Sequence, residues 1–535
     1  MPSTKNIVAT ISVAFSAIWV CAAIPNVSAV RTPELAGKSV VFVGHRQYPQ
    51  DHHNTANIFQ RGEINESSWN ACKGDSAMYR LDFDDDGNPR PPQVLLTAPD
   101  GIIRDIEVSY DAKKILFSMR KSLNASYKIY EMDVSSGKTR KLTKLEDAND
   151  IDPVYLGDGE IVFASTRAAK YCGCNRHIMA NLYKMDSDGN NIVQIGNSIE
   201  FENTPSVLSD GRILYTRWEY VDRNFSGAQG LWTCNADGTN HTLYWGQETK
   251  NACLNAVQMP KSSRVCAILG SCHDVAWGAL ALIDKKNKKM GLFLVDFESG
   301  AEKFVAELES DDIGIFDAKM LAPRIAPQTG TDRRSWGDGR KAHVYVSDVY
   351  VGTHMRGIKR GDIKFLRVVH DPSKLTFSDG WWQNEGSQAP AMNYDDYDRK
   401  RLLGIVPVAE DGSAFFEVPA DKFIFLQALN ADGEMLQTMR SGFSAMPDEI
   451  VSCVGCHESR FSPPPISAQT FRRKAPDKII RKPEICAEKC FSYIEMVQPI
   501  FDKNCLSCHD FGGRGAEKSG IVLAGDRGLV FNRSY

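Results

Sequence analysis

The chain has 535 residues, which is enough for about three domains of ordinary size. Hydrophobic residues make up 42% of it and charged residues 24%, as in soluble globular proteins. The net charge of −4 is close to neutral for this length, so no basic surface and no nucleic-acid partner are expected.

The N-terminus has the pattern of an export signal. Lys5 supplies a positive charge, Ile7 to Ala23 is an uncharged apolar run, and Val27-Ser28-Ala29 offers small residues for cleavage before Val30. Residues 1–29 are therefore expected to be a signal peptide, and the mature protein is expected in the periplasm or an equivalent extracytoplasmic compartment. The alternative is an uncleaved membrane anchor. No other run is long and apolar enough to span a bilayer, so no membrane span is expected after cleavage.

A repeat with a period near fifty runs from about residue 36 to 310. Each copy has an aromatic residue, then Asp or Asn three positions later, then a glycine turn; the copies begin at Tyr79, Tyr130, Tyr183, Trp232 and Phe293. Short β-branched and aromatic segments between such turns are typical of strands. Groups of strands at this period favour β-propeller blades over the alternative, a β-sandwich. The fold class is predicted as mainly β, with a propeller over 36–375 whose last blades come from 310–375.

Three polar inserts interrupt the repeat at residues 51–55, 171–177 and 272–274. All lie on connections between strands, where binding and catalytic residues concentrate, and a propeller brings such loops to one face. Each contains side chains that can bind a metal. Cys172 and Cys174, spaced C-x-C, are the most suggestive pair for zinc. The alternative for each insert is a hydrogen-bonded polar loop.

The chain after residue 375 divides into three further parts. Strand-like runs flank the Asp411-Gly412 turn, which predicts a small antiparallel β middle domain over 376–445. A first haem segment and a Pro-rich linker are expected over 446–485. An incomplete second cytochrome c-type domain, α-helical, is expected over 486–535, because Tyr493 to Phe501 has apolar residues at helical spacing.

Two C-x-x-C-H motifs stand near the end of the chain, Cys453-Val-Gly-Cys456-His457 and Cys505-Leu-Ser-Cys508-His509. This pattern attaches haem c. The two cysteines form thioethers with the haem vinyl groups, and the adjacent histidine ligates the iron. A single copy could be chance or a zinc site, but two copies in an exported chain favour two haem c groups, with His457 and His509 as iron ligands.

The second iron ligand decides the chemistry, because His or Met gives an electron-transfer haem and an open position allows catalysis. Met446 is a candidate for the first haem, against the alternative of a core methionine. No His or Met follows His509. The sequence is therefore expected to be a C-terminal truncation, unless the second haem borrows its ligand.

These features together resemble the alpha subunit of hydrazine synthase and its family of exported propeller–cytochrome proteins, from about residue 36 to the end. The matching stretches are Asp51–Ala56, Tyr171–His177, His273–Leu280, Val406–Ser413, Met439-Arg440, Cys453–His457 and Val497–His509. The resemblance implies that nitric oxide is reduced toward hydroxylamine at the first haem, while the second haem relays electrons and takes its distal His from further down the chain. Hydroxylamine then reacts with ammonia at another subunit's haem, in a hetero-oligomer with beta and gamma type subunits.

The resemblance also implies a zinc ion associated with His457. By position its cysteine ligand corresponds to Cys172 or Cys174, and its aspartate ligand to Asp51. The family has an iron-binding tyrosine four residues after the first motif histidine. That position is Phe461 here, which has no oxygen to bind iron.

The expected function is an exported dihaem c-type redox protein with hydrazine synthase-like activity on small nitrogen compounds. No catalytic residue is assigned beyond His457 at the first haem site. One alternative is a non-catalytic electron-transfer cytochrome whose propeller docks electron-transfer partner proteins. Another is a binding protein with degenerate haem sites.

Overall fold

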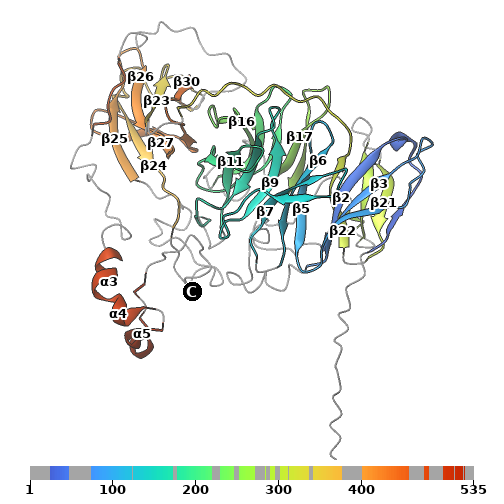
Figure 1. The fold of residues 1–535 in the computed structure, drawn as a ribbon. Coiled ribbons are helices and arrows are strands. Elements are labelled where there is room, and N and C mark those ends of the chain that lie inside the picture. The colour runs from blue at the N-terminus through green and yellow to red at the C-terminus, as the bar shows by residue number, and fades with distance from the viewer. Residues whose placement is uncertain are drawn as a thin grey trace, which may run out of the picture.

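The computed structural model describes residues 25–46, 74–122, 125–172, 178–219, 229–245, 252–270, 283–284, 289–295, 302–310, 313–335, 341–352, 354–375, 401–456, 475–480, 498–510, 512–521 and 523–524. In these ranges the regular structure is almost all strand, apart from one 3-10 turn, η1 (Pro33–Leu35), and a C-terminal helical group (Figure 1). The predicted mainly β fold class is therefore confirmed. None of the helices described is both long and apolar enough to cross a membrane.

Six sheets are formed by the described strands between Val27 and Met320. Sheet one is β22 (Ile313–Met320), β2 (Ser39–Arg46), β3 (Ser76–Asp82), β4 (Gln93–Ala98); sheet two is β5 (Ile102–Val108), β6 (Lys114–Arg120), β7 (Lys128–Asp133), β8 (Thr139–Lys141); sheet three is β9 (Asp150–Tyr155), β10 (Ile161–Ser165), β11 (Asn181–Met185), β12 (Val193–Gln194); sheet four is β13 (Glu202–Val207), β14 (Ile213–Trp218), β15 (Gln229–Cys234), β16 (Thr242–Trp245); sheet five is β17 (Ala252–Gln258), β18 (Val265–Gly270); and sheet six is β19 (Ile283–Asp284), β20 (Lys289–Val295), β21 (Glu302–Leu308), β1 (Val27–Ala29).

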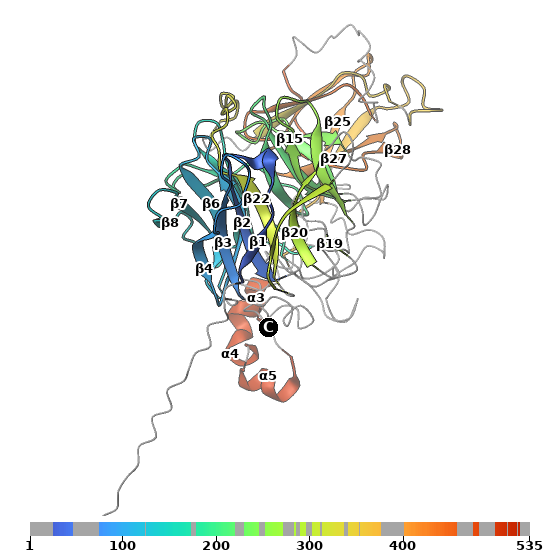
Figure 2. The same cartoon turned by 90° about the vertical axis from the view of Figure 1, so that its right-hand side faces the viewer.

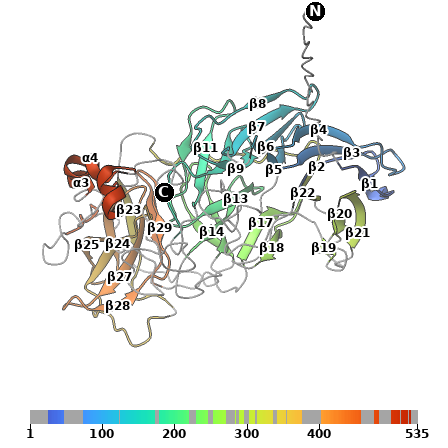
Figure 3. The same ribbon diagram turned by 90° about the horizontal axis from the view of Figure 1, so that it is seen from below.

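Hydrophobic side chains fill the spaces between consecutive sheets. One cluster, with Val41 and Phe117, joins sheet one to sheet two, and another, with Phe42 and Leu308, joins sheet one to sheet six. Further clusters join sheets two to three, three to four and four to five. Sheet one thus packs on both the second and the last sheet, and Figure 3 shows the sheets arranged around a common centre. This arrangement is the predicted β-propeller.

The aromatic repeat in the sequence marks cross-strand pairs within the sheets. Tyr79 on β3 lies opposite Phe42 on β2, with ring centroids 5.3 Å apart. The same pairing recurs between β7 and β6 (5.6 Å) and between β11 and β10 (6.1 Å). Such pairs stabilise neighbouring strands by about 0.2–1 kcal/mol each. The period near fifty is therefore the length of one four-stranded unit.

Strands from opposite ends of the propeller sequence close the ring. β22 pairs with β2 in sheet one, where Figure 2 shows β2, β3 and β22 together. β1 pairs with β21 in sheet six, with Val27 opposite Leu308. Because β1 lies inside the expected signal peptide of residues 1–29, cleavage before Val30 would remove it from this sheet.

The first strands of sheets one to five carry a second repeat, which the aromatic pattern does not reveal. Each has one non-glycine residue of positive φ at a β-bulge: Asp105 (56°), Asp152 (53°), Thr204 (46°), Asn255 (50°) and Asp317 (51°). Asp and Asn tolerate this conformation better than most residues, because their short side chains can hydrogen-bond locally.

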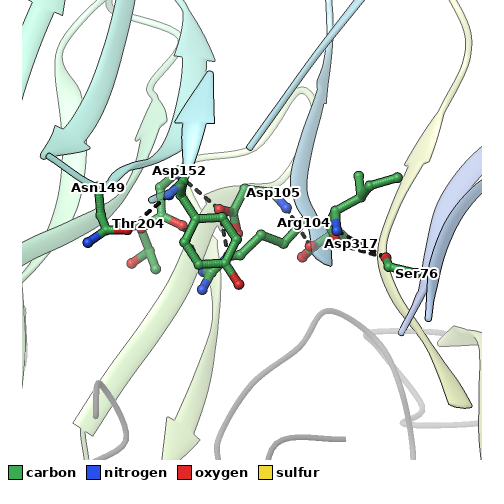
Figure 4. Close-up of polar contacts among 9 residues, drawn as sticks. Ser76, Arg104, Asp105, Asn149, Asp152, Thr204 and Asp317 are labelled. Atoms are coloured by element: carbon green, nitrogen blue, oxygen red, sulfur yellow. Dashed lines mark hydrogen bonds and ion pairs between the residues drawn. The ribbon is translucent and has the colours of Figure 1, made fainter. Parts of the chain in front are cut away.

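These bulge residues are linked from sheet to sheet by hydrogen bonds. Asp317 Oδ2 accepts the backbone N–H of Asp105 at 2.7 Å, and Asp105 Oδ2 accepts that of Asp152 at 3.1 Å. Asp152 Oδ2 in turn accepts the N–H of Thr204 at 3.0 Å (Figure 4). Arg104 lies among them, with its Nε 2.7 Å from Asp105 and its Nη2 3.3 Å from Asp152. We call Asp317, Asp105, Asp152 and Thr204 the inter-sheet chain.

Residues 321–335, here called the strap, run from β22 across three sheets to the next part of the chain. Arg324 N–H donates to the carbonyl of Tyr110 in the turn between β5 and β6 (2.8 Å). Thr329 accepts the N–H of Asp158 in the corresponding turn of sheet three (3.2 Å). The strap ends where Ser335 N–H donates to the carbonyl of Pro447 (3.1 Å).

The remaining strands form a second β-region of two sheets. One is β26 (Ala414–Pro419), β23 (Lys341–Val346), β30 (Ile450–Cys453); the other is β25 (Arg401–Pro407), β24 (Phe365–His370), β27 (Phe423–Leu429), β28 (Met435–Thr438), with β29 (Phe443–Ser444) pairing β27. β23 and β24, expected as late propeller blades, thus hydrogen-bond to strands further along the chain. Every pair is antiparallel except β23 with β30.

Candidate haem sites

The first C-x-x-C-H motif begins at the end of β30. This strand runs parallel to β23, and the alignment continues beyond both strands. Ser347 N–H donates to the carbonyl of Cys453 at 2.8 Å, and Asp348 N–H donates to that of Val454 at 2.9 Å. The backbone of the motif is therefore held by the segment that follows β23.

Both cysteines of this motif are accessible at the edge of the second β-region. Cys453 and Cys456 are half-buried and pack against its hydrophobic core. Thiols in this position would be able to hold a haem through thioether bonds, next to apolar side chains. His457, the predicted iron ligand, and Phe461 lie outside the described residues.

Two glycines allow the motif to approach the supporting segment closely. A Cβ on Gly352 would lie 1.4 Å from the carbonyl oxygen of Cys456, and a Cβ on Gly455 would lie 2.2 Å from that of Val351. No side chain fits at such distances without movement of the backbone. The segment is itself held by Asp348, whose carboxylate makes a 2.6 Å ion pair with Arg360.

Substituting Gly352 by alanine should therefore reduce haem attachment at the first motif. The new methyl group displaces the Cys456 backbone, and overpacking of this kind costs about 1–3 kcal/mol. Haem-peptide mass spectrometry would show less haem on Cys453 and Cys456 but unchanged haem on the second motif. Gly330→Ala is the matched control, because nothing lies within 4 Å of a Cβ there. Equal haem on the first motif of both variants would contradict the expectation.

The second motif lies in a helical segment, as predicted. α3 (Gln498–Asn504) leads into Cys505, α4 (Leu506–His509) holds the rest of the motif, and α5 (Arg514–Ser519) follows. Cys505 N–H donates to the carbonyl of Phe501 at 2.8 Å, and His509 N–H donates to that of Cys505 at 2.9 Å. The helical turn thus sets the spacing of both cysteines and the histidine.

The imidazole of His509 is oriented by its own backbone surroundings. Its Nδ1 lies 2.9 Å from the carbonyl oxygen of Ile521, which requires the proton on Nδ1, so that Nε2 is the nitrogen that can bind a metal. Metal-binding histidines commonly have this second hydrogen bond, which fixes the tautomer and the ring. Gly515 adjoins Nε2, where a Cβ would lie 2.9 Å away. The donor set therefore fits an axial haem ligand.

The helical segment lacks a hydrophobic core of its own. Between residues 498 and 524, Ala516 is the one buried side chain among those described. Ile500 and Ile521 are 56% and 53% exposed, and Cys508 is exposed as well. So small a segment needs a further element to become stable. A haem bound through Cys505, Cys508 and His509 would supply the apolar surface that these side chains lack.

The proposed zinc ligands are only partly described. Cys172 is fully buried, while Cys174 and Asp51 lie outside the described residues. Among the described residues, no three His, Cys, Asp or Glu side chains are placed to hold a metal ion. The zinc site therefore stays a prediction.

The three polar inserts share one starting position in the propeller. Those containing Asp51, Cys172 and Cys272 follow β2, β10 and β18, each the second strand of its sheet. Equivalent strand ends lie on one face of a propeller. The insert after β10 also reaches the second β-region, because Tyr171 N–H donates to the carbonyl of Lys374 at 2.8 Å.

Arg217, on the same face, fastens the propeller to the second β-region, and the sequence analysis missed it. Its Nη2 donates to Glu219 at 2.9 Å and to the carbonyl of Gly442 at 2.7 Å. Its guanidinium lies 4.0 Å from the ring centre of Trp232 and 4.9 Å from that of Phe423. An arginine at the end of a strand carries no sequence signal for such a contact, since its partners in the second β-region, Gly442 and Phe423, lie over 200 residues away.

Burial lowers the pKa of two further side chains near this contact, His370 and Lys170. His370 is 9% exposed, and burial, with Lys422 and Arg401 nearby, lowers its pKa to about 4. Burial also lowers the pKa of Lys170 to about 8, although Glu202 and Glu200 act in the opposite direction. His370 is therefore neutral at physiological pH.

Met446, considered above as a distal ligand, is fully buried in the described structure. Its sulfur lies 3.3 Å from Arg334 Nη1 in the strap, and its N–H donates to Glu449 at 2.7 Å. These contacts fit the alternative of a core methionine.

Comparisons with known proteins bear on the second β-region and on the fold. Residues 361–458 match the model of the hydrazine synthase alpha subunit middle domain, a range that includes the first motif. No curated protein sequence matches the chain. The solved hydrazine synthase of Kuenenia stuttgartiensis is similar over 92% of this chain and 83% of its own, with 15% identity and a TM-score of 0.64. TolB of Acinetobacter baumannii covers 54% of this chain and 67% of its own at 14% identity, with a TM-score of only 0.34.

At 15% identity the Kuenenia structure establishes a shared fold, and the family model adds a sequence match that is confined to one domain. The chain is thus similar to hydrazine synthase in two ways: residues 361–458 match the middle-domain model of its alpha subunit, and the fold is shared with the Kuenenia structure.

Proposed function

We propose that this protein is an exported dihaem c-type redox protein. Cys453, Cys456 and His457 would hold one haem, and Cys505, Cys508 and His509 the other. The observation that carries the proposal is the His509 ring, whose Nδ1 donates a hydrogen bond to the carbonyl of Ile521, as metal-binding histidines commonly do. Bound haem supplies one-electron chemistry that no amino-acid side chain in the motif provides.

The two sites are proposed to do different work. The first motif lies at the edge of a packed β-region matched by the hydrazine synthase middle-domain model, so we assign nitrogen-oxide reduction toward hydroxylamine to it. The second lies on short helices with exposed surface, which suits electron relay. Zinc beside His457, held by Cys172 or Cys174 with Asp51, and a hetero-oligomer with beta and gamma type subunits belong to the same proposal.

Phe461 favours a second candidate function, an electron-transfer cytochrome without nitrogen chemistry. A phenylalanine cannot replace the iron-binding oxygen that the family resemblance places four residues after His457. In this case the propeller would serve to dock electron-transfer partner proteins.

Haem stoichiometry tests the proposal common to both candidates. The mature chain, expressed with a cytochrome c maturation system, should carry two haem masses. Cys453→Ser with Cys456→Ser should remove one, and Cys505→Ser with Cys508→Ser the other. A chain without haem would refute the proposal.

Optical spectra with nitric oxide then separate the two candidates. Nitrogen chemistry requires an open, high-spin haem that binds nitric oxide. The spectrum of this haem should be absent from the variant in which Cys453 and Cys456 are both replaced by serine. Two low-spin, six-coordinate haems that do not react with nitric oxide would support the second candidate, electron transfer without nitrogen chemistry.

A further inference from the structure

Residues 475–480 lie between the two haem motifs, in a stretch expected to be linker, yet they pair with the second β-region. Asp477 N–H donates to the carbonyl of Phe415 at 2.8 Å, and Glu417 N–H donates to that of Asp477 at 2.9 Å. Ile480 and Ile405 exchange two backbone hydrogen bonds of 2.9 and 3.1 Å. The segment, which we call the linker anchor, thus joins β26 of one sheet to β25 of the other.

The sequence of β25 accommodates the linker anchor at one residue. Gly404 has a φ of 145°, a backbone conformation that residues other than glycine rarely adopt. A Cβ there would lie 2.4 Å from the Ile479 side chain and 2.5 Å from the carbonyl oxygen of Ile480. Ile479 also packs against the core of the second β-region. Glycine is needed here both for its backbone conformation and for the close approach of the anchor.

The first haem motif starts from the same β-region, on β30. The chain is therefore hydrogen-bonded to this region at Asp477 and Ile480, before it reaches Cys505. Only the stretch after Ile480 separates the second motif from the scaffold that holds the first, about half of the chain between the motifs. Even for a fully flexible chain, halving the length raises the local concentration of one end at the other by roughly threefold.

We propose that the linker anchor positions the second haem at a fixed separation from the first, so that electrons pass between them within one chain. This inference rests on the proposed dihaem function. In a merely structural role, the anchor would add hydrogen bonds to the second β-region without setting the distance between haems. The two roles differ in what happens to that distance when the anchor is released.

Ile480→Pro and Asp477→Pro each remove one N–H that holds the anchor. Ile480→Ala is the matched control, because it keeps the N–H and shortens a side chain that is 47% exposed. Hydrogen exchange needs no haem and is measured first. The amides of Asp477 and Ile480 should exchange at least tenfold more slowly than exposed amides in the wild type and Ile480→Ala, and the remaining anchor amide should lose this protection in each proline variant. Unprotected wild-type amides would overturn the anchor itself.

Pulsed electron paramagnetic resonance then measures the distance between the two ferric haems in full-length mature protein, after mass spectrometry has confirmed two haems per chain. The wild type and Ile480→Ala should give one narrow distribution of inter-haem distances. In the proline variants this distribution should be at least twofold broader, and electron transfer between the haems should be at least threefold slower. An unchanged distribution and rate in both folded, dihaem proline variants would overturn the inference and leave the proposed function intact. A wild type without two haems would end both, and the mass identifies that outcome.

Discussion

Substituting Arg217 by alanine should lower the free energy of unfolding by about 3–5 kcal/mol. The Arg217 side chain is 2% exposed and pairs with Glu219, which is 4% exposed. Removing the guanidinium leaves the Glu219 carboxylate buried without this charge, and Gly442 loses the donor to its carbonyl. The substitution also removes the cation that lies between the ring of Trp232 in the propeller and the ring of Phe423 in the second β-region. Equilibrium urea unfolding measures the loss.

The control for this prediction is Arg212→Ala. Arg212 pairs with Asp210 at 2.7 Å, and both side chains are substantially exposed, at 38% and 52%. Exposed pairs of this kind contribute about 0–1 kcal/mol. Arg217→Lys should fall between the two variants, because lysine keeps the charge but not the planar fork. A loss for Arg217→Ala no larger than that for Arg212→Ala would show that the contact between the two β-regions contributes little.

Substituting Asp152 by asparagine should make the protein more stable than the wild type by a margin that grows with pH. Burial is the largest cause that raises the Asp152 pKa, to about 8, with Asp105 adding to it and Arg104 opposing it. Between pH 4 and 8 the unfolded chain has lost this proton while the folded chain keeps it, so wild-type stability falls as the pH rises. Asparagine cannot ionise, and it keeps an oxygen for the N–H of Thr204. The gain should reach a few kcal/mol, at about 1.4 kcal/mol per pKa unit.

Urea unfolding at pH 5 and pH 8 measures this difference. Asp133→Asn provides a contrast of opposite sign, because hydrogen bonds from Ser135 and Ser136 lower the pKa of the exposed Asp133 to about 2. That variant should lose stability relative to the wild type where the carboxylate is ionised. An equal stability advantage of Asp152→Asn at both pH values would contradict the prediction, because it would mean that burial does not raise the pKa of Asp152.

The propeller was predictable because its signal is local. Tyr79 and Phe42 face each other within one repeat, and the same pair recurs in the next sheets, so the period survives in the sequence. The inter-sheet chain had a signal too, since Asp105, Asp152 and Thr204 recur 47 and 52 residues apart. The inter-sheet chain was not predicted, because a single Asp or Thr inside a strand is common and a sequence does not reveal a positive φ.

The second β-region was harder to predict because strands do not encode their partners. β23 and β24 were recognisable as strands, but β24 pairs with β25 and β27 on either side, beyond the boundary expected at residue 375. At the second haem motif, Cys505, Cys508 and His509 followed from the pattern alone. The Nδ1 partner of His509 did not, because it is a backbone carbonyl, at Ile521, and every residue has one.

The strap changes how the propeller should come apart. A repeat array held only by contacts between neighbours can lose its units one at a time. Here one extended segment touches the turns of sheets two, three and four and then joins the second β-region, while Gly157 and Gly211 admit it within van der Waals contact. Unfolding of any of these sheets would break its own contact with the strap, a segment that the other sheets share. We therefore expect the propeller sheets and the second β-region to unfold cooperatively, so that the stability of the first C-x-x-C-H motif depends on the whole scaffold.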